Sequence, residues 1–504
     1  MDVLNHLLVG FSVVLEPMNL FYCFIGVLIG TLVGVLPGLG PVAAMSLLLP
    51  ATFHITPEAS IIMLAGIYYG SMYGGSTTSI LVNIPGEAAS VITCIDGYQM
   101  ARQGRAGAAL GISAFGSFIA ATIGIIGLML LSVPLVDLAL KFGPSEYFSL
   151  MVLGMVILTF LVSASMTRAL MMSAIGIILG TVGQDSMSGV ARFTFKIPEL
   201  LDGVGLIPVV MGLFGISEVL VNVELKVRSE ILSGKVKGLL PTLKDWSRSI
   251  WSIIRGTFIG FFLGILPGGG GVIASFVSYA IEKRVSSHPE EFGKGAIEGV
   301  AGPESANNAA AQGAFIPLLS LGIPSNVVMA MLLGALIIHG VTPGPLVLTS
   351  HPRLFWGVVA SMYVGNAMLL VLNLPLISIW VKLLKVPYSI LFPLILLLCF
   401  IGAYSVNNSM FDVALMMGFG IIGYLMRKLS LEAAPLILAF VLGPMLETSL
   451  RLALIKSGGS FSIFFTRPIS ATFLIIAIIL FLISLLPKLR SKRPGVVLGS
   501  DDEA

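Results

Sequence analysis

The sequence predicts an all-α polytopic membrane protein with two inverted structural repeats and broken, re-entrant helices. Three observations support this prediction. First, 56% of the 504 residues are hydrophobic and 11% are charged, whereas soluble domains carry about 25% charged residues. Second, apolar stretches of bilayer length recur along the chain and predict about 10–12 transmembrane segments. Third, landmarks of the first half return in the second half at a nearly constant spacing.

The clearest landmark is a helix that carries a glycine at every fourth position and ends in Leu-Pro-Gly. In the first half, Gly26, Gly30 and Gly34 lead to Leu36-Pro37-Gly38, and in the second half Gly256, Gly260 and Gly264 lead to Leu266-Pro267-Gly268. The offset is 230 residues (256 − 26 = 230 and 267 − 37 = 230). This spacing puts the small residues on one helix face, so we expect another helix to approach each face closely. Because GxxxG alone is common in membrane helices, the shared Leu-Pro-Gly ending is the stronger indication of an internal duplication.

A second landmark is a proline turn further along each half. Ile84-Pro85-Gly86 matches Ile323-Pro324-Ser325 at an offset of 239 residues (324 − 85 = 239), which implies an insertion of about nine residues between the landmarks. If each half contains an odd number of spans, the halves are inverted across the membrane, as in many secondary transporters.

The basic residues divide the chain further. Lys and Arg cluster in residues 224–250, and the positive-inside rule places such a segment in the cytoplasm. We therefore expect a first repeat over residues 1–223, a basic cytoplasmic linker over 224–250 and a second repeat over 251–448. An extra C-terminal span and a cytoplasmic tail should follow over 449–504.

Two polar stretches fall inside membrane segments. Small and polar residues fill positions 68–87 and the first part of 302–345, and each stretch contains a proline turn that restarts a helix. Unpaired backbone groups cannot face lipid, so a broken helix must be buried or line a cavity. We also expect a polar loop from Asp96 to Gly107, and Glu304, next to Pro303, at a helix start.

The sequence lacks the motifs of several enzyme classes. Gly268–Gly271 is followed by Val272, so the chain has no GK[ST] phosphate loop, and it contains neither HExxH nor GxSxG. The three cysteines are far apart, and the five histidines are scattered. We expect no catalytic residues, no bound cofactor, no resident metal and no nucleic-acid partner.

Solute recognition is the function that the two polar stretches favour. Broken helices present N-terminal N–H groups and positive dipole ends, which suit an anionic solute. Hydroxyls, amides and turn backbones would add directed hydrogen bonds. The predicted substrate-binding residues are Gly74, Gly75, Ser76, Thr77, Thr78, Asn83, Pro85, Gly86, Ser305, Asn307, Asn308, Pro324, Ser325 and Asn326.

A coupling ion is expected in the same region. Oxygens of Ser, Thr and Asn and carbonyls freed by the breaks suit Na⁺, and buried acids are functional candidates in membranes. The ion-coupling candidates are Glu304, Glu87, Gly38 and Gly268. The structural alternative is that the turns are kinks and that the two glutamates cap helices.

Three segments resemble a known family. The segments GTLVGVLPGLGP (30–41), YYGSMYGGSTTSILVNIPGEAASVITCIDGYQMARQGRAGAAL (68–110) and GPESANNAAAQGAFIPLLSLGIPS (302–325) resemble the large permease subunit of tripartite tricarboxylate transporters, the TctA family. The resemblance implies a bacterial inner-membrane permease that works with a small membrane subunit (TctB-like) and a periplasmic solute-binding protein (TctC-like). It also implies uptake of citrate or other carboxylates, driven by a Na⁺ or H⁺ gradient.

One departure from the family pattern bears on the solute. The second turn is usually Ile-Pro-Gly, but here Ser325-Asn326 follows Pro324, which adds a hydroxyl. The resemblance therefore does not identify which carboxylate is transported. The alternatives are a carboxylate/cation symporter that needs no binding protein, an intramembrane enzyme using Glu87 or Glu304, and a passive channel. For the transporter, we expect alternating access by movement of the broken-helix region against a scaffold.

Overall fold

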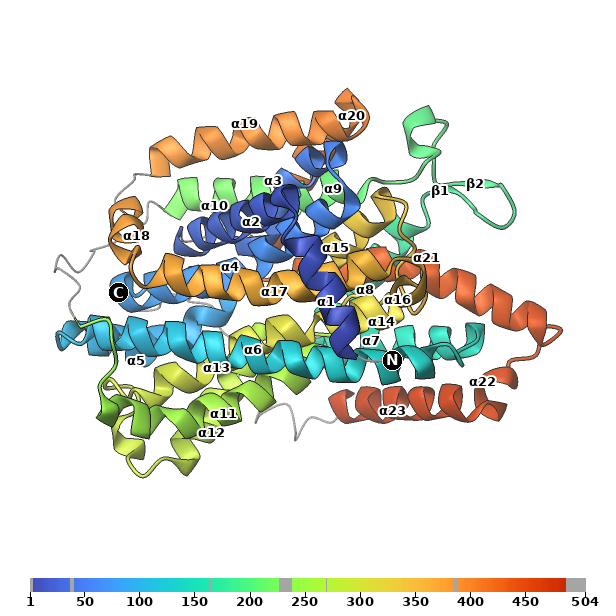
Figure 1. The fold of residues 1–504 in the computed structure, drawn as a ribbon. Coiled ribbons are helices and arrows are strands. Elements are labelled where there is room, and N and C mark those ends of the chain that lie inside the picture. Colours follow the sequence, from blue (N-terminus) through green and yellow to red (C-terminus); the bar gives the residue numbers. More distant parts are fainter. Residues whose placement is uncertain are drawn as a thin grey trace. The chain divides into compact units, whose positions relative to one another are not determined.

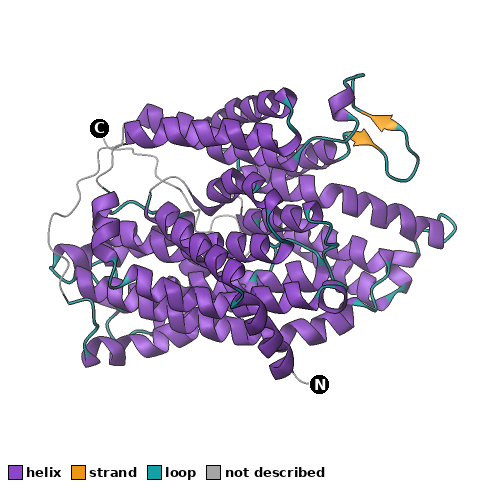
Figure 2. Cartoon of the chain, turned by 45° about the horizontal axis from the view of Figure 1, so that its top comes forward, coloured by secondary structure: helices purple, strands orange, loops and turns teal. Residues whose placement is uncertain are grey.

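The computed structural model describes residues 3–36, 40–162, 165–225, 238–268, 270–384 and 388–485. Almost all of its regular structure is helical (Figures 1 and 2). The α-helices are α1 (Val3–Val14), α2 (Pro17–Val35), α3 (Gly40–Leu48), α4 (Pro57–Val82), α5 (Val91–Arg102), α6 (Ala106–Ala139), α7 (Pro144–Val162), α8 (Met166–Gly180), α9 (Leu206–Val210), α10 (Ser217–Leu225), α11 (Leu243–Ile265), α12 (Gly271–Val285), α13 (Glu298–Gly313), α14 (Phe315–Leu321), α15 (Val327–Ile338), α16 (Val347–Ser350), α17 (Pro352–Asn373), α18 (Ile377–Leu383), α19 (Tyr388–Asn407), α20 (Met410–Lys428), α21 (Ala433–Lys456), α22 (Ile463–Thr466) and α23 (Pro468–Leu485).

Shorter elements connect these helices. The 3₁₀ segments are η1 (Pro50–His54), η2 (Ala88–Ser90), η3 (Pro198–Leu200) and η5 (Pro289–Glu291), and a π-helical segment, η4 (Met211–Ile216), joins α9 to α10. Strands β1 (Gly183–Gln184) and β2 (Ala191–Arg192) pair antiparallel, with Gly183 opposite Arg192.

Six helical segments of the described chain are long and apolar enough to cross a membrane. They are Pro17–Val35, Ala106–Ala139, Leu206–Glu224, Pro352–Asn373, Met410–Lys428 and Ala433–Lys456. Six shorter apolar helices of 10–17 residues accompany them. The polytopic membrane character is therefore confirmed, and the larger number of spans stays a prediction.

The chain divides into two compact units. The first unit comprises residues 1–141 and 205–428, and the second comprises residues 142–204 and 429–504. Each unit combines segments from both halves of the sequence. In the second unit, α8 packs on α21, where a Cβ at Gly176 would lie 2.2 Å from the carbonyl oxygen of Leu436.

An ion-pair network holds the β1–β2 hairpin to α21 within the second unit. Arg451 Nη1 lies 2.8 Å from Asp185 Oδ1, and Arg192 Nη1 lies 2.8 Å from Glu447 Oε1. Hydrogen bonds from the Ser188 hydroxyl and then from Arg451 hold the pKa of Asp185 well below its ordinary range. Glu447 therefore has a structural role.

Two polar helices, α4 and α13, lie at the centre of the first unit. From Ala59 to Val82 every residue of α4 is buried, and so is every residue of α13. The start of α4 is fixed by Pro57 at the first helical position and by the Thr56 hydroxyl, which accepts a hydrogen bond from the Ala59 N–H. Neither helix faces lipid, which explains how they carry so many small and polar residues.

Glycine faces allow two other helices to pack closely on this pair (Figure 1). A Cβ at Gly30 of α2 would lie 2.6 Å from the carbonyl oxygen of Ile67 in α4, and a Cβ at Gly260 of α11 would lie 2.0 Å from that of Ala306 in α13. Real Cβ atoms do not approach an oxygen so closely, so both positions require glycine. The predicted role of these glycines in close helix packing is confirmed.

The glycine contacts of α2 and α11 repeat with fixed offsets. The glycines differ by 230 residues and their carbonyl partners by 239 (260 − 30 = 230 and 306 − 67 = 239). The other contacts follow the same rule: Gly26 with Met63, Gly34 with Ser71, Gly256 with Gly302 and Gly264 with Ala310. These are the two offsets found in the sequence.

Three local expectations are wrong. The polar run from Tyr68 to Ser79 does not interrupt α4, which continues to Val82 because its surroundings are protein. Residues 96–102 are helical, since α5 extends to Arg102, so the polar loop is short. Glu304 lies inside α13, which begins six residues earlier at Glu298, so it does not cap the helix.

Candidate functional site

Two proline turns interrupt the helices next to α4 and α13. The first turn, residues 83–87, follows α4, and the second turn, residues 322–326, follows α14. Each turn opens with a left-handed residue, Asn83 at φ 59° and Gly322 at φ 72°. These two positions differ by 239 residues (322 − 83 = 239), the offset of the prolines.

Each turn closes with a polar side chain that starts the next helix. The Glu87 carboxylate accepts a hydrogen bond from the Ala89 N–H at 2.7 Å and caps η2, which leads into α5. The Asn326 side chain accepts one from the Met329 N–H at 2.9 Å and caps α15. The capping role considered for Glu87 is therefore confirmed.

The same two side chains connect the halves of the chain. In the first crossing contact, Asn307 Nδ2 donates to Glu87 Oε1 at 2.9 Å. In the second crossing contact, Asn326 Nδ2 donates to the Tyr68 hydroxyl oxygen at 3.2 Å. Position 68 corresponds to 307 and position 87 to 326 at the 239-residue offset. Each contact therefore joins the same pair of equivalent positions, with the two halves of the chain interchanged.

Glu304 lies one turn before Asn307 on α13 and is 1% exposed. Its Oε1 accepts a hydrogen bond from the Thr93 hydroxyl of α5. Asn308 Nδ2 donates to Ser117 Oγ of α6 at 2.7 Å and to the Glu304 carbonyl oxygen at 3.0 Å. Side chains from α5, α6 and the first turn therefore converge on one segment of α13.

Several buried polar atoms of this region have no hydrogen-bond partner among the described residues. They are Glu304 Oε2, Ser305 Oγ, Asn307 Oδ1, Asn308 Oδ1, Gln312 Oε1 and Ser325 Oγ. Buried polar atoms are nearly always paired in proteins. A row of unpaired oxygens on one helix and on the adjacent turn indicates a place where a ligand supplies the missing interactions.

No basic side chain balances the two glutamates. Within the described ranges, none of the ion pairs that Lys, Arg or His form includes Glu87 or Glu304. Those ranges also contain no group of three or more His, Cys, Asp or Glu residues arranged to hold a metal ion.

Some predicted residues serve the packing of α4 on α2. A Cβ at Gly74 would lie 2.3 Å from the Thr31 carbonyl oxygen, and Thr78 Oγ1 donates to the Val35 carbonyl at 2.5 Å. Gly86 fits against Gly34, whose carbonyl oxygen would lie 1.9 Å from an added Cβ. Ser76 is buried, and its hydroxyl donates to the Tyr73 carbonyl at 2.8 Å.

The remaining predicted residues lie around the turns. Gly75 faces Glu87, since an added Cβ would lie 2.7 Å from the Glu87 Cγ. Thr77 and Pro324 are buried, Pro85 is half-buried and Asn83 is exposed.

Of the two glycines that are ion-coupling candidates, the structure describes one. The Gly268 N–H donates to the Ser325 carbonyl at 2.8 Å, which ties the Leu-Pro-Gly turn to the second turn. Gly38 lies outside the described residues.

Four contributing residues were not predicted: Tyr68, Ser90, Thr93 and Ser117. Tyr68 follows from the sequence, because subtracting the 239-residue offset from Asn307 gives position 68. The Ser90 hydroxyl accepts from Ser79 at 2.9 Å and donates to the Glu87 carbonyl at 2.8 Å. No sequence pattern indicated that Thr93 or Ser117 would approach α13.

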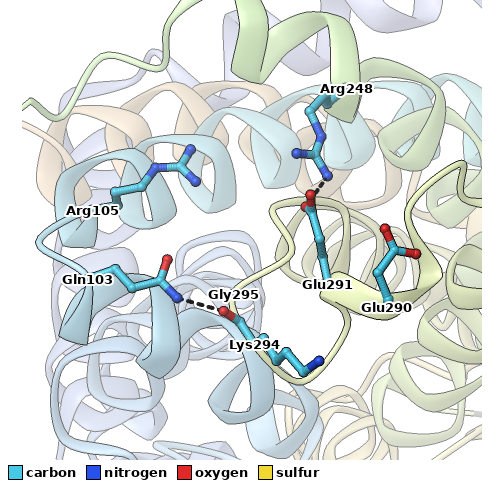
Figure 3. Close-up of a pocket in the computed structure, with 7 residues that line it drawn as sticks. All are labelled: Gln103, Arg105, Arg248, Glu290, Glu291, Lys294 and Gly295. Carbon is cyan, nitrogen blue, oxygen red and sulfur yellow. Dashed lines mark hydrogen bonds and ion pairs between the residues drawn. The ribbon is translucent and has the colours of Figure 1, made fainter.

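A separate charged cavity of about 430 Å³ opens near the start of α11 (Figure 3). Two of its arginines are paired: Arg248 Nη2 lies 2.6 Å from Glu291 Oε2, which also lines the cavity, and Arg105 Nη2 lies 2.6 Å from Oδ1 of Asp245, which does not. The cavity is lined by Gln103, Arg105, Arg248, Glu290, Glu291, Lys294 and Gly295. None of these residues belongs to the predicted site.

One family model and two curated relatives match the chain. The model of the tripartite tricarboxylate transporter TctA family matches residues 20–438. An Agrobacterium vitis protein described as an uncharacterized 52.8 kDa protein in the TAR-I ttuC' 3'region is 52% identical over 501 residues, covering 99% of this chain and 100% of that protein. A second Agrobacterium vitis protein, from the TAR-II ttuC' 3'region, is 56% identical over 242 residues, 48% of this chain and 100% of its own length. No solved structure matches the chain.

Proposed function

Because the chain belongs to the tripartite tricarboxylate transporter TctA family, we propose that it is the large permease subunit of a binding-protein-dependent secondary transporter. It imports tricarboxylates or related carboxylates across the bacterial inner membrane, driven by a Na⁺ or H⁺ gradient. Its partners are a small membrane subunit and a periplasmic solute-binding protein. The observation that carries the proposal is the family match together with the two buried polar helices, α4 and α13, and the proline turns beside them.

The proposed architecture is a pair of inverted repeats. The repeated glycine contacts and the exchanged crossing contacts support a duplication, since both follow the offsets of 230 and 239 residues. The first repeat spans residues 1–223 and the second spans 251–448, joined by the basic cytoplasmic linker 224–250. Residues 449–504 add the last span and the cytoplasmic tail.

The proposed solute site uses the two turns and the unpaired oxygens of α13. The N–H groups at the start of α15 lie beside the second turn, whose capping residue is neutral, and provide partial positive charge for carboxylates. The Ser325 hydroxyl, which has no partner in the described chain, is available to a solute. Movement of this region against the remaining helices gives alternating access.

Uptake into proteoliposomes tests the proposal. We would measure accumulation of labelled citrate and succinate by this chain and its small membrane partner under an inward Na⁺ gradient, with and without the soluble binding protein. Accumulation that requires the binding protein supports the tripartite transporter. Accumulation without it favours a stand-alone symporter, and downhill flux without accumulation identifies a channel.

A further inference from the structure

Two buried carboxylates, one in the first crossing contact and one a helical turn away on α13, lack a counter-charge. Glu87 is 7% exposed and Glu304 is 1% exposed, and no Lys, Arg or His of the described chain pairs with either. An isolated ionised carboxylate is costly to bury unless a cation or hydrogen bonds compensate it. A cation is therefore the missing partner of this cluster.

Both oxygens of Glu87 already accept hydrogen bonds from nitrogen. Oε1 accepts from Asn307 Nδ2 at 2.9 Å and Oε2 from the Ala89 N–H at 2.7 Å. A proton on either oxygen would face an N–H donor. Both carboxylate oxygens are therefore satisfied by N–H donors, and Glu87 holds the Asn307 side chain in one orientation.

The unpaired oxygens next to Glu87 fit a metal cation better than a proton. Glu304 Oε2 and Asn307 Oδ1 receive no hydrogen bond of good geometry from the described chain, although the Ser113 hydroxyl of α6 lies near Glu304. The two residues lie three positions apart on α13, so they share one face. An amide oxygen does not bind a proton near neutral pH, but it is a good ligand for a hard cation. The pair therefore offers one charged and one neutral oxygen ligand.

Two glycines let the neighbouring segments approach these side chains closely. A Cβ at Gly271, the first residue of α12, would lie 2.3 Å from Asn307 Oδ1. A Cβ at Gly75 would lie 2.7 Å from Glu87 Cγ and 3.2 Å from Ser90 Oγ. Larger residues at either position would displace the side chains of the cluster. The start of α12 also directs partial positive charge toward the cluster and offsets part of its remaining negative charge.

We infer that Glu87, Glu304 and Asn307 form a binding site for one Na⁺ ion, the coupling ion of the transporter. This inference rests on the proposed function and adds the location and the identity of the ion. Glu304 Oε2 and Asn307 Oδ1 bind the ion, and Glu87 orients Asn307 through Nδ2 and contributes its charge. The equivalent contact of the second half, between Asn326 and Tyr68, joins two side chains without a carboxylate.

Na⁺ binding to the purified full-length chain tests the inference without any transport. The thermal unfolding midpoint would be measured against NaCl at constant ionic strength, with choline chloride as replacement and KCl as comparison. A ligand that binds only the folded state raises the midpoint, and above its dissociation constant the rise follows the logarithm of the ligand concentration. We expect this rise with Na⁺ only. An equal response to K⁺, or no response, would overturn the inference.

Three variants locate the site. Glu304→Gln and Asn307→Ala should weaken the apparent affinity for Na⁺ about 100-fold, whereas Tyr68→Phe, at the neutral contact, should leave it unchanged. Because the readout is the Na⁺-dependent change in each variant, a lower starting stability does not obscure it. Retention of the Na⁺ response in both Glu304→Gln and Asn307→Ala would contradict the assigned ligands.

The binding result and the transport result are separable. Na⁺ binding without carboxylate uptake would leave the site intact and refute the proposed function. Carboxylate accumulation driven by a pH gradient, with no Na⁺ response in the unfolding measurement, would support the proposed function and replace Na⁺ by a proton.

Discussion

The two proline turns occupy equivalent positions in the chain but carry different chemistry. The first turn ends in Glu87, an acid that Asn307 contacts, and the second ends in Asn326, an amide that contacts Tyr68. Both residues also start a helix. The two turns therefore share their geometry, while the carboxylate is confined to one of them. In the proposed duplicated architecture, one turn contributes to the ion site and its counterpart forms a contact between neutral side chains.

Removal of the charge at the first turn should have the largest effect. Glu87→Gln keeps the size of the side chain and its capping oxygen but removes the negative charge, so Na⁺-driven accumulation of carboxylate should fall about 10–100-fold. Uptake by proteoliposomes under a Na⁺ gradient is the measurement. The matched control is Asn326→Asp, which keeps the helix cap and adds a charge at the neutral turn. Equal losses in both variants would refute the asymmetry.

Substitutions in the glycine faces of α2 and α11 test the close helix packing that both halves of the chain share. A Cβ at Gly260 would lie 2.0 Å from a carbonyl oxygen, and one at Gly30 would lie 2.6 Å away. Gly260→Ala and Gly30→Ala should therefore each destabilise the protein by about 1–3 kcal/mol, measured by thermal unfolding in detergent. The control is Gly418→Ala in α20, where nothing lies within 4 Å. If the control loses as much stability as the two glycine-face variants, close packing is not the cause.

Ser325 distinguishes the second turn from the first. Its backbone is not left-handed, so glycine is not required there, whereas Gly86 is needed because Gly34 approaches it closely. Ser325→Gly should therefore fold normally and change the relative uptake of citrate and succinate several-fold, by about one hydrogen bond of 0.5–1.5 kcal/mol. Competition between the two labelled solutes measures the ratio. An unchanged ratio would exclude Ser325 from solute recognition.

The smallest effect is expected at the neutral contact. Tyr68→Phe removes one hydrogen bond at 3.2 Å and should lower stability by about 0.5–1.5 kcal/mol. The Na⁺ concentration that gives half-maximal accumulation should stay at the wild-type value. Thermal unfolding and uptake of the same preparation give both values. A loss of accumulation as large as that of Glu87→Gln would contradict the assignment of the ion to the Glu87–Asn307 contact.

The sequence predicted the scaffold better than the site. The glycine spacing and the two offsets predicted close contacts that the structure contains, because a fixed spacing reports directly on one helix face. The sequence does not predict the position of Glu304 inside α13, because a proline such as Pro303 usually indicates a helix start. The structure places Pro303 within α13, since prolines are tolerated inside buried membrane helices. Thr93 and Ser117 approach α13 only through tertiary packing, which no local pattern records.

Paired fluxes of ²²Na⁺ and labelled carboxylate in one proteoliposome preparation test the central claim most directly. The preparation contains this chain, its small membrane partner and the soluble binding protein. We predict that carboxylate stimulates ²²Na⁺ uptake by the wild-type protein and that Glu304→Gln abolishes this stimulation. Carboxylate accumulation that needs no Na⁺ and survives Glu304→Gln would contradict the account.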